Sequence, residues 1–286
     1  MMTQKIKTSL LLLGISSIVT AMLCMASCTK IDEGDFLIPA GLPEWKGQYI
    51  LLEEYTAHRC PNCPSGAKTA ADMSNLLGDK LIVVGLHVSD LAAPAPGFTV
   101  DYRTEAGTIY EGALTNVTDG LPTGLLNRTL FNKNLSLPKG DWAVNAMNLY
   151  KKQAVAKMDI AATMAADKRI SIAVNADFTS EYQGKGDIHL ITWIVEDSLI
   201  SRQLIKDQPN DPKYVHRHVM RGAVEGAWGQ KVAEPLVPAQ HKINKTLEIV
   251  ADPSWKPQHL YVVSFLCDNQ TREIIQVIET HVKVIQ

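Results

Sequence analysis

The strongest fold signal in the sequence is YILLEEYTAHRCPNCPSG, residues 49–66. Its first seven residues, YILLEEY, begin with an apolar run and are bounded by aromatic residues, which is typical of a buried strand. A short turn follows, and Cys60 and Cys63 then open an alanine-rich segment. The spacing of apolar residues predicts a helix over 62–77 that ends at Gly78. The sequence therefore predicts a Cys-x-x-Cys between a strand and a helix, where a protein can hold a reactive dithiol.

Strand and helix patterns continue to alternate after this stretch. Residues 81–88 are a continuous apolar run, as in a central parallel strand. Helices are expected over 102–114 and 141–153, and a strand is expected to start at Pro122, where a missing N–H donor is tolerated. The alternation predicts an α/β domain over 48–156, with helices layered on a sheet.

Beyond residue 157 the apolar residues repeat with a period of two. Residues 170–178 alternate strictly between apolar and polar side chains, as a half-buried strand does. Further strands are expected over 158–164, 187–196, 215–224, 243–251, 259–267 and 274–284. This many short strands separated by turn signals favours an antiparallel β-sandwich over 157–286, resembling an immunoglobulin-type module.

The N-terminus has the features of an export signal. Two lysines precede a short apolar run, residues 10–23, and small residues then precede Cys28. The run is too short and too interrupted to be a transmembrane anchor. Residues 25–28, MASC, resemble the lipobox of bacterial lipoproteins. That resemblance implies a signal peptide over 1–27, followed by lipidation of Cys28 with fatty acyl chains such as palmitate, which would anchor the mature chain to a membrane.

Residues 28–47 are expected to be a tether between the lipid and the folded protein. An aspartate at position 29 would resemble the signal that retains enteric lipoproteins in the inner membrane, and Thr29 stands there instead. The sequence therefore resembles one addressed to the outer membrane. Residues 30–35, KIDEGD, resemble the charged tether of surface-displayed lipoproteins, and the alternative is a solvated linker.

Composition and motifs exclude several classes of function. The chain is 46% hydrophobic and 20% charged, with a formal net charge of −2. That balance gives no electrostatic reason to expect nucleic acid as a partner, and aromatic residues do not interleave with basic ones. The sequence has no glycine-rich phosphate loop, no Gly-x-Ser-x-Gly and no His-Glu-x-x-His. No cofactor is expected.

Three interpretations of the Cys-x-x-Cys stay open. In the redox interpretation, Cys60 lies at the helix N-terminus and Cys63 lies a turn inside. The helix dipole, Arg59 and His58 would then stabilise a Cys60 thiolate that attacks a partner disulfide, and Cys63 would resolve the product. In the second interpretation, the two cysteines form a structural disulfide in an oxidising compartment.

The third interpretation is metal binding, for which the sequence offers too few ligands. A closed zinc site needs four ligands, and there is no second Cys-x-x-Cys. His216 and His218 would share one face of a strand, but no acidic or thiol ligand stands near them. No metal site is therefore assigned. Cys267, in an apolar run, is expected to be a buried and inert thiol.

Residues 121–123, Leu-Pro-Thr, together with the dithiol resemble the thioredoxin fold, in which a cis-proline sits beside the Cys-x-x-Cys. The resemblance implies that Pro122 is part of the site. It also implies that Glu54 takes the place of a buried acid that exchanges protons with the inner cysteine. The alternative is that Glu54 faces solvent, because the adjacent Glu53 points to the opposite face. Arg59 and the Pro-Asn pair depart from thioredoxin, so its redox poise does not transfer.

The lipobox, the segment EEYTAHRCPNCP at 53–64, the Leu-Pro-Thr strand and the β-rich tail together resemble the twenty-eight-kilodalton outer-membrane protein family. These are thioredoxin-fold lipoproteins of Gram-negative anaerobes. The resemblance implies an outer-membrane lipoprotein that exchanges disulfides with exported proteins or a redox partner. The alternative is a non-catalytic surface protein, an adhesin or complex subunit, in which the disulfide is structural.

Overall fold

The structure, a computed structural model, describes residues 41–115 and 120–285. The predicted signal peptide, Cys28 and most of the predicted tether lie outside the described residues. The last residues of that tether belong to the folded unit, which begins at Glu44. The Trp45 indole donates to the Gln48 carbonyl oxygen at 2.7 Å, and Gly47 pairs with Gln153. The fold therefore starts earlier than the boundary expected at residue 48.

Strands outnumber helices in the part of the chain that is described. The helices are α2 (Cys63–Leu77), α3 (Glu105–Leu114) and α4 (Trp142–Tyr150). The first strands are β1 (Ile50–Thr56), β2 (Leu81–His87), β3 (Thr123–Leu126), β4 (Leu137–Pro138), β5 (Ala156–Met164), β6 (Arg169–Phe178), β7 (Tyr182–Gln183) and β8 (Ile188–Glu196). The later strands are β9 (Leu199–Gln203), β10 (Asp211–His216), β11 (Val219–Ala223), β12 (Gln230–Ala233), β13 (Leu236–Val237), β14 (Lys242–Val250), β15 (Leu260–Asp268), β16 (Ile274–His281) and β17 (Lys283–Val284).

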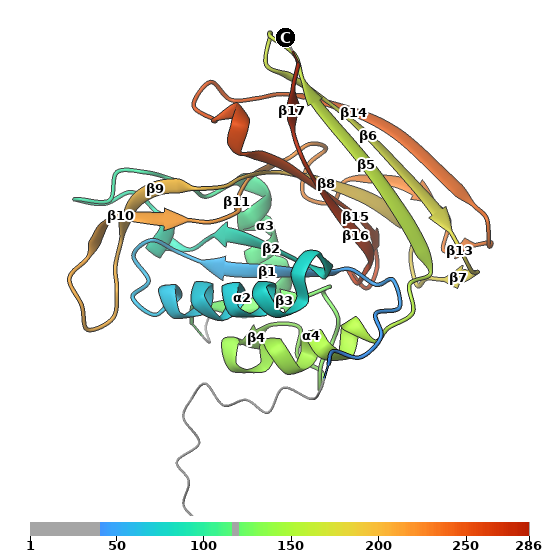
Figure 1. Cartoon of the computed structure of the whole chain (residues 1–286), viewed down its shortest axis with the longest axis horizontal. Coiled ribbons are helices and arrows are strands. Elements are labelled where there is room, and N and C mark those ends of the chain that lie inside the picture. Colours follow the sequence, from blue (N-terminus) through green and yellow to red (C-terminus); the bar gives the residue numbers. More distant parts are fainter. Residues whose placement is uncertain (1–40, 116–119, 286) are drawn as a thin grey trace, which may run out of the picture. The chain divides into compact units, whose positions relative to one another are not determined.

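A nine-stranded sheet contains strands from both halves of the chain (Figure 1). Its order is β16-β15-β8-β11-β2-β1-β3-β4, and β12 also pairs with β8. β1 is parallel to β2 over its whole length and antiparallel to β3. The fold is thus mixed α/β, with many strands in sheets and few helices among the described residues.

The helices cover β1 on its two faces. Ile50 and Leu52 pack with α2 and α4, whereas Leu51 and Tyr55 pack with α3 and with β8 and β15. Because successive side chains point to opposite faces, a strand buried on both sides needs apolar residues at successive positions, and residues 50–52 provide them. The predicted helix after the cysteines is confirmed as α2, and Gly78 follows it with φ +58.

The C-terminal strands form two packed layers, but they are not a separate domain. A second sheet, β14-β6-β5-β17, packs through Ile172 and Val174 of β6 onto Ile194 of β8 and Val262 of β15. The facing layer is the nine-stranded sheet, which also contains β1 and β2. The expected immunoglobulin-like module over 157–286 is therefore not found as a self-contained sandwich. The reason is that β8 and β15 are buried on both faces, so their second face packs against the N-terminal segment.

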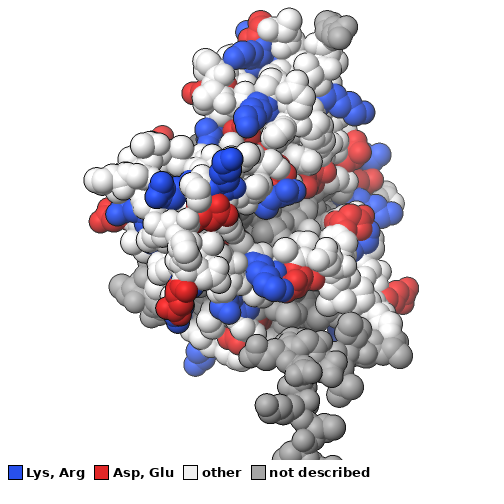
Figure 2. Space-filling view, turned by 60° about the vertical axis from the view of Figure 1, so that its left-hand side comes forward, with Lys and Arg blue, Asp and Glu red and all other residues white. Residues whose placement is uncertain are grey.

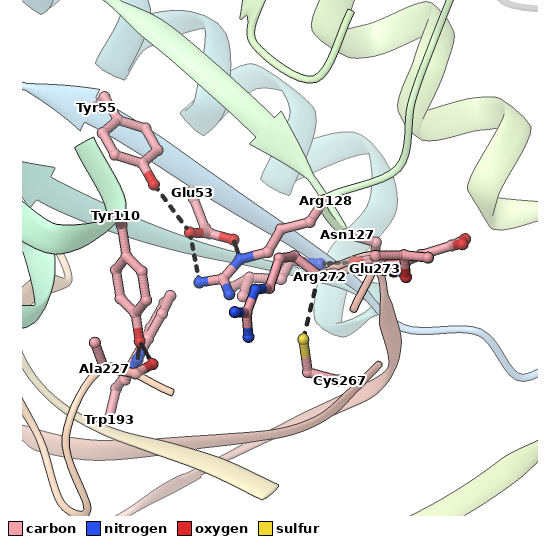
Figure 3. A network of polar contacts seen from close by, with 12 residues as sticks. Glu53, Tyr55, Tyr110, Asn127, Arg128, Trp193, Ala227, Cys267, Arg272 and Glu273 are labelled. Atoms are coloured by element: carbon pink, nitrogen blue, oxygen red, sulfur yellow. Dashed lines mark hydrogen bonds and ion pairs between the residues drawn. The ribbon is translucent and has the colours of Figure 1, made fainter. Parts of the chain in front are cut away.

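A buried ion pair lies where the N-terminal and C-terminal segments meet (Figure 3). The Arg128 guanidinium donates from Nε to Glu53 at 2.6 Å, and both side chains are fully buried. Arg128 also lies over the ring of Tyr110, 4.5 Å from its centroid. Cys267 is buried nearby, as expected, and burial raises the pKa of its thiol to about 11.

Candidate functional site

Cys60 and Cys63 form a disulfide in the turn between β1 and α2, with their Cα atoms 5.4 Å apart. The turn is followed at once by the helix, because α2 begins at Cys63 and carries Pro64 in its first turn, where a missing N–H costs nothing. Cys60 therefore lies in the turn, and Cys63 is the first helical residue instead of lying a turn inside. Each cysteine is only 2% exposed.

Pro122 lies beside the disulfide, as the sequence predicts. The Leu121–Pro122 peptide bond is cis, and the Leu121 carbonyl oxygen is 3.6 Å from Cys60 Sγ. Gly66 of α2 faces Pro122 so closely that a Cβ at position 66 would lie 2.8 Å from the proline ring. The missing side chain at Gly66 thus lets α2 approach the segment that contains Pro122.

Glu54 is buried on the face of β1 that α2 covers. Its Oε1 lies 3.0 Å from the position that a Cβ on Gly66 would occupy, and it has no hydrogen-bond partner among the described residues. Burial raises the pKa of this carboxyl to about 8. The alternative, a solvent-facing Glu54, is wrong, whereas Glu53 does point to the opposite face, where it pairs with Arg128.

His58 and Arg59, the two residues expected to tune the dithiol, lie in different environments. His58 is buried and its ring stacks on Phe98, with centroids 5.4 Å apart. Burial lowers the pKa of His58, so the ring is uncharged at neutral pH. The Arg59 guanidinium donates to the backbone carbonyl of Asp90. Arg59 is therefore the one remaining candidate for the predicted redox tuning.

Two further histidines, which the sequence analysis did not connect with the dithiol, lie behind His58. The ring centroid of His87 is 6.2 Å from that of His58 and 5.2 Å from that of His216. Burial lowers the pKa of His87 well below its usual value and that of His216 to about 4. No group of three His, Cys, Asp or Glu residues within the described ranges is arranged to hold a metal ion.

His218 separates from His216 instead of sharing its strand face. It has a φ of +42 and bonds to Asp197 and Glu279, each at 3.1 Å. Burial alone would lower its pKa, but the bonds to the two carboxylates raise it to about 9. The two histidines therefore have different environments, one apolar and one ionic, and cannot bind one ion together.

A two-stranded ribbon, residues 199–216, lies against the turn that holds the disulfide (Figure 1). We call this ribbon the arm; it consists of β9, its connecting loop and β10. The backbone N–H of Leu204 donates to the His58 carbonyl at 2.9 Å, and that of Lys206 donates to the Pro61 carbonyl at 3.0 Å. The Gln203 amide donates to the Cys60 carbonyl at 2.9 Å. No pattern in the sequence indicates these contacts.

A cavity of about 530 Å³ opens beside the inner cysteine. Cys63, Glu54, His87 and Gln203 are among the residues that line it. A volume of this size is in the range of ligand cavities, and it can hold water between Glu54 and the solvent. The carboxyl and the inner cysteine thus share one solvent-connected space.

Charge and hydropathy add little to this picture of the site. Figure 2 shows basic and acidic side chains interspersed over the face that it displays. None of the helices within residues 41–115 and 120–285 has the length and apolar character needed to cross a membrane.

Comparison with known proteins gives a family match and two similar folds. The sequence model of the family described as Outer membrane protein Omp28 matches residues 114–286, more than half of the chain. The match includes Pro122 and the arm but not the two cysteines. No curated protein matches the chain in sequence.

Solved structures resemble the chain at low sequence identity. HBP35 of Porphyromonas gingivalis has a TM-score of 0.63 at 15% identity, covering 84% of this chain and 76% of that one. An Agrobacterium tumefaciens protein has a TM-score of 0.50 at 14% identity, covering 83% and 95%. A domain of the outer membrane lipoprotein Omp28 from Porphyromonas gingivalis reaches only 0.33 at 19% identity, covering 47% and 93%. The first two similarities show a shared fold.

Proposed function

This chain belongs to the Outer membrane protein Omp28 family, and from that premise we propose that it is a lipid-anchored protein that exchanges disulfides with other exported proteins through Cys60 and Cys63. Its place in the outer membrane follows from the family. The anchor at Cys28 is supported by the lipobox resemblance of residues 25–28. The mass of the mature N-terminal peptide, extracted from membranes, tests the anchor.

We further propose that β1–β4 with α2 and α4 act as a thioredoxin-like unit. Three observations support it: β1 and β2 are parallel, the disulfide lies between β1 and a helix, and Pro122 lies against that helix. In such a unit the strand and helix hold the dithiol rigidly, while the proline segment borders it. The unit shares its sheet with the C-terminal strands, so it is not an independent domain.

The observation that carries the proposal is the buried carboxyl of Glu54. A structural disulfide gives no reason to bury an unpartnered carboxyl beside it, which costs free energy. A thiol that resolves a mixed disulfide does give a reason for the buried carboxyl. The pKa of Glu54, about 8, lies close to the ordinary thiol pKa of about 8.5, so a proton can pass between the two groups at little cost.

The exchange that we propose balances in protons and electrons. The Cys60 thiolate attacks a disulfide of the partner, and one partner sulfur leaves and takes a proton from water. In the molecules whose Glu54 is ionised, a minority at pH 7, the Cys63 thiol then passes its proton to the Glu54 carboxylate and attacks Cys60 Sγ. The second partner sulfur leaves and takes the proton that Glu54 holds, so the partner disulfide is reduced to two thiols while Cys60 and Cys63 are oxidised to the disulfide.

Reduction of insulin tests this proposal in vitro. The soluble chain from residue 29 onward, reduced and freed of reductant, is expected to cleave insulin disulfides, whereas Cys60→Ser is inactive. Glu54→Gln is expected to slow resolution by roughly a hundredfold, the usual loss for a missing general base. A wild-type rate equal to that of Cys60→Ser would refute the exchange.

One observation favours a second function, a non-catalytic surface protein that acts as an adhesin or complex subunit. Both cysteines are only 2% exposed, so the disulfide as it stands cannot be reached by a partner protein. In that case the disulfide only staples a four-residue turn, a loop for which the chain-entropy formula gives roughly 2 kcal/mol. A folded Cys60→Ser/Cys63→Ser variant would then keep its partner binding unchanged.

A further inference from the structure

The arm bonds to the backbone of the turn that contains the disulfide. Leu204 and Lys206 donate to the carbonyls of His58 and Pro61, one on each side of Cys60. The bonds bridge segments that lie far apart in the sequence. The arm therefore acts on the disulfide turn from outside the proposed thioredoxin-like unit.

Gln203 is the central contact between the arm and the turn. Its side chain is 2% exposed, and its amide donates to the carbonyls of Cys60 and Leu204, each at 2.9 Å, and to that of Ala57 at 3.4 Å. The Cys60 and Ala57 carbonyls also accept backbone N–H groups within the turn, so the amide adds buried hydrogen bonds from the arm that stabilise the closed arrangement.

Several segments lie over the disulfide turn, and the arm is the one that is best suited to move. Ala92 and Leu121 also pack on the disulfide, but the segment of Ala92 is bonded to α3 through Ser89 and Glu111, and Leu121 lies just before β3. β9 and β10 pair only with each other, and such a ribbon is marginally stable by itself. The outward side chains of Ile200 and Val215 are 59% and 42% exposed, so one face of the ribbon is uncovered.

We propose that the arm is a lid, which must lift from the disulfide turn before a thiol can reach Cys60 Sγ. The inference rests on the proposed disulfide exchange for its biological meaning, but its chemistry can be tested alone. In the closed state the disulfide is protected, and lifting requires the loss of the bonds made by Gln203, Leu204 and Lys206 and of the contact of Arg202 with the Phe98 ring. The base of the arm stays anchored, because His216, which bonds to Ser201 within the arm at 2.9 Å, packs on His87.

Dithiothreitol is the probe for the lid. Its thiolate attacks Cys60 Sγ, Cys63 leaves and is protonated, and the second dithiothreitol thiol closes the cyclic disulfide and releases Cys60. If only the open form reacts, the wild-type rate equals that of an exposed disulfide multiplied by the open fraction. An oxidised peptide of residues 57–66 gives the exposed rate.

Two measurements on the wild-type protein must agree. Hydrogen exchange at Leu204 and Lys206 gives the open fraction of the arm independently. We expect the two fractions to match within about threefold and to exceed the globally unfolded fraction found in urea. Reduction as fast as in the peptide, or reduction governed by global unfolding alone, would overturn the lid.

Two substitutions in the arm make a matched pair. Gln203→Ala is expected to speed reduction on the order of tenfold, the effect of one or two lost hydrogen bonds. Gln208→Ala changes an exposed glutamine in the same arm and is expected to leave the rate unchanged. Equal rates for both variants and the wild type would contradict the proposal.

The outcomes for the lid and for the exchange are separable. A faster Gln203→Ala that still fails to reduce insulin would keep the lid and remove the exchange. If the protein reduces insulin but Gln203→Ala does not change the rate at which dithiothreitol reduces the disulfide, the exchange stands and the lid is refuted. If Gln203→Ala does not fold, the comparison of the dithiothreitol rate with hydrogen exchange in the wild-type protein still tests the lid.

Discussion

Replacing Glu54 by Gln should stabilise the protein at neutral pH while it impairs the proposed exchange. Glu54 is buried, and its Oε1 has no partner among the residues described. Burial raises the pKa of this carboxyl from 4.5 to about 8. Gln has nearly the same shape and remains neutral at every pH, so the substitution removes only the titration.

The magnitude follows from proton linkage. Because the folded pKa is raised, the stability that the proton contributes is present in full below pH 4.5 and is lost as the pH rises through about 8. At pH 7 the carboxyl is ionised in the unfolded chain, where its pKa is 4.5, and protonated in the folded protein, where its pKa is about 8. Binding this proton on folding, 2.5 pH units above the unfolded pKa, costs about 3 kcal/mol. Glu54→Gln should therefore gain roughly that amount at pH 7 and little at pH 4.5.

Urea unfolding followed by circular dichroism measures this difference. The midpoints of the wild type and Glu54→Gln should diverge between pH 5 and pH 8, with unchanged m-values. Glu181→Gln, at an exposed position, is the matched control and should follow the wild type. A Glu54→Gln variant that is less stable than the wild type at pH 7, with the same pH dependence, would refute the buried, uncharged carboxyl and with it the proposed base.

Three further predictions concern packing and charge. Gly66→Ala should destabilise the protein by roughly 1–3 kcal/mol, because its Cβ would lie 2.8 Å from a proline ring. Gly112→Ala, which has open space in α3, should stabilise it by about 0.5–1 kcal/mol. Thermal unfolding compares the two variants, and equal effects would contradict the close approach of Gly66 to the proline. Arg128→Met should lower the free energy of unfolding by about 3–5 kcal/mol, because it leaves a buried carboxylate unpaired. Adding Glu53→Leu should restore much of the lost stability. A double variant as unstable as Arg128→Met would count against the ion pair. His218→Gln should lower the free energy of unfolding by up to about 3 kcal/mol below pH 6.5, because the pKa of His218 is raised in the folded protein. The loss should shrink as the pH rises through about 9. A loss independent of pH would show that the imidazolium is not the stabilising form.

The strands of the C-terminal half could be predicted well individually but not in their arrangement. Residues 170–178 alternate because only one face of β6 is buried, and β6 was expected there. β8 and β15 instead contain continuous apolar runs, which indicate burial on both faces. That signal was present in the sequence, and the sandwich interpretation overlooked it. The partner of the second face lies in the N-terminal half, which no local pattern reveals.

The candidate site divides in the same way. Cys60, Cys63 and Pro122 could be placed together because a strand, a helix start and a proline-led strand follow one another in a known order. For Glu54, the period of two separates it from Glu53 but does not say which face α2 covers. Gln203 is 143 residues from Cys60 in the chain, and a single buried glutamine in a short strand has no sequence signature. Its role depends on tertiary contacts alone.

Covalent trapping in intact cells tests the proposed exchange most directly. A Cys63→Ser variant, expressed with its own signal sequence and quenched with acid before alkylation, keeps the attacking thiol but cannot resolve the product. We predict mixed disulfides between Cys60 and exported proteins, which vanish on reduction and are absent from Cys60→Ser/Cys63→Ser. A Cys63→Ser variant that folds in the outer membrane and carries no more mixed disulfides than the double variant would contradict the account.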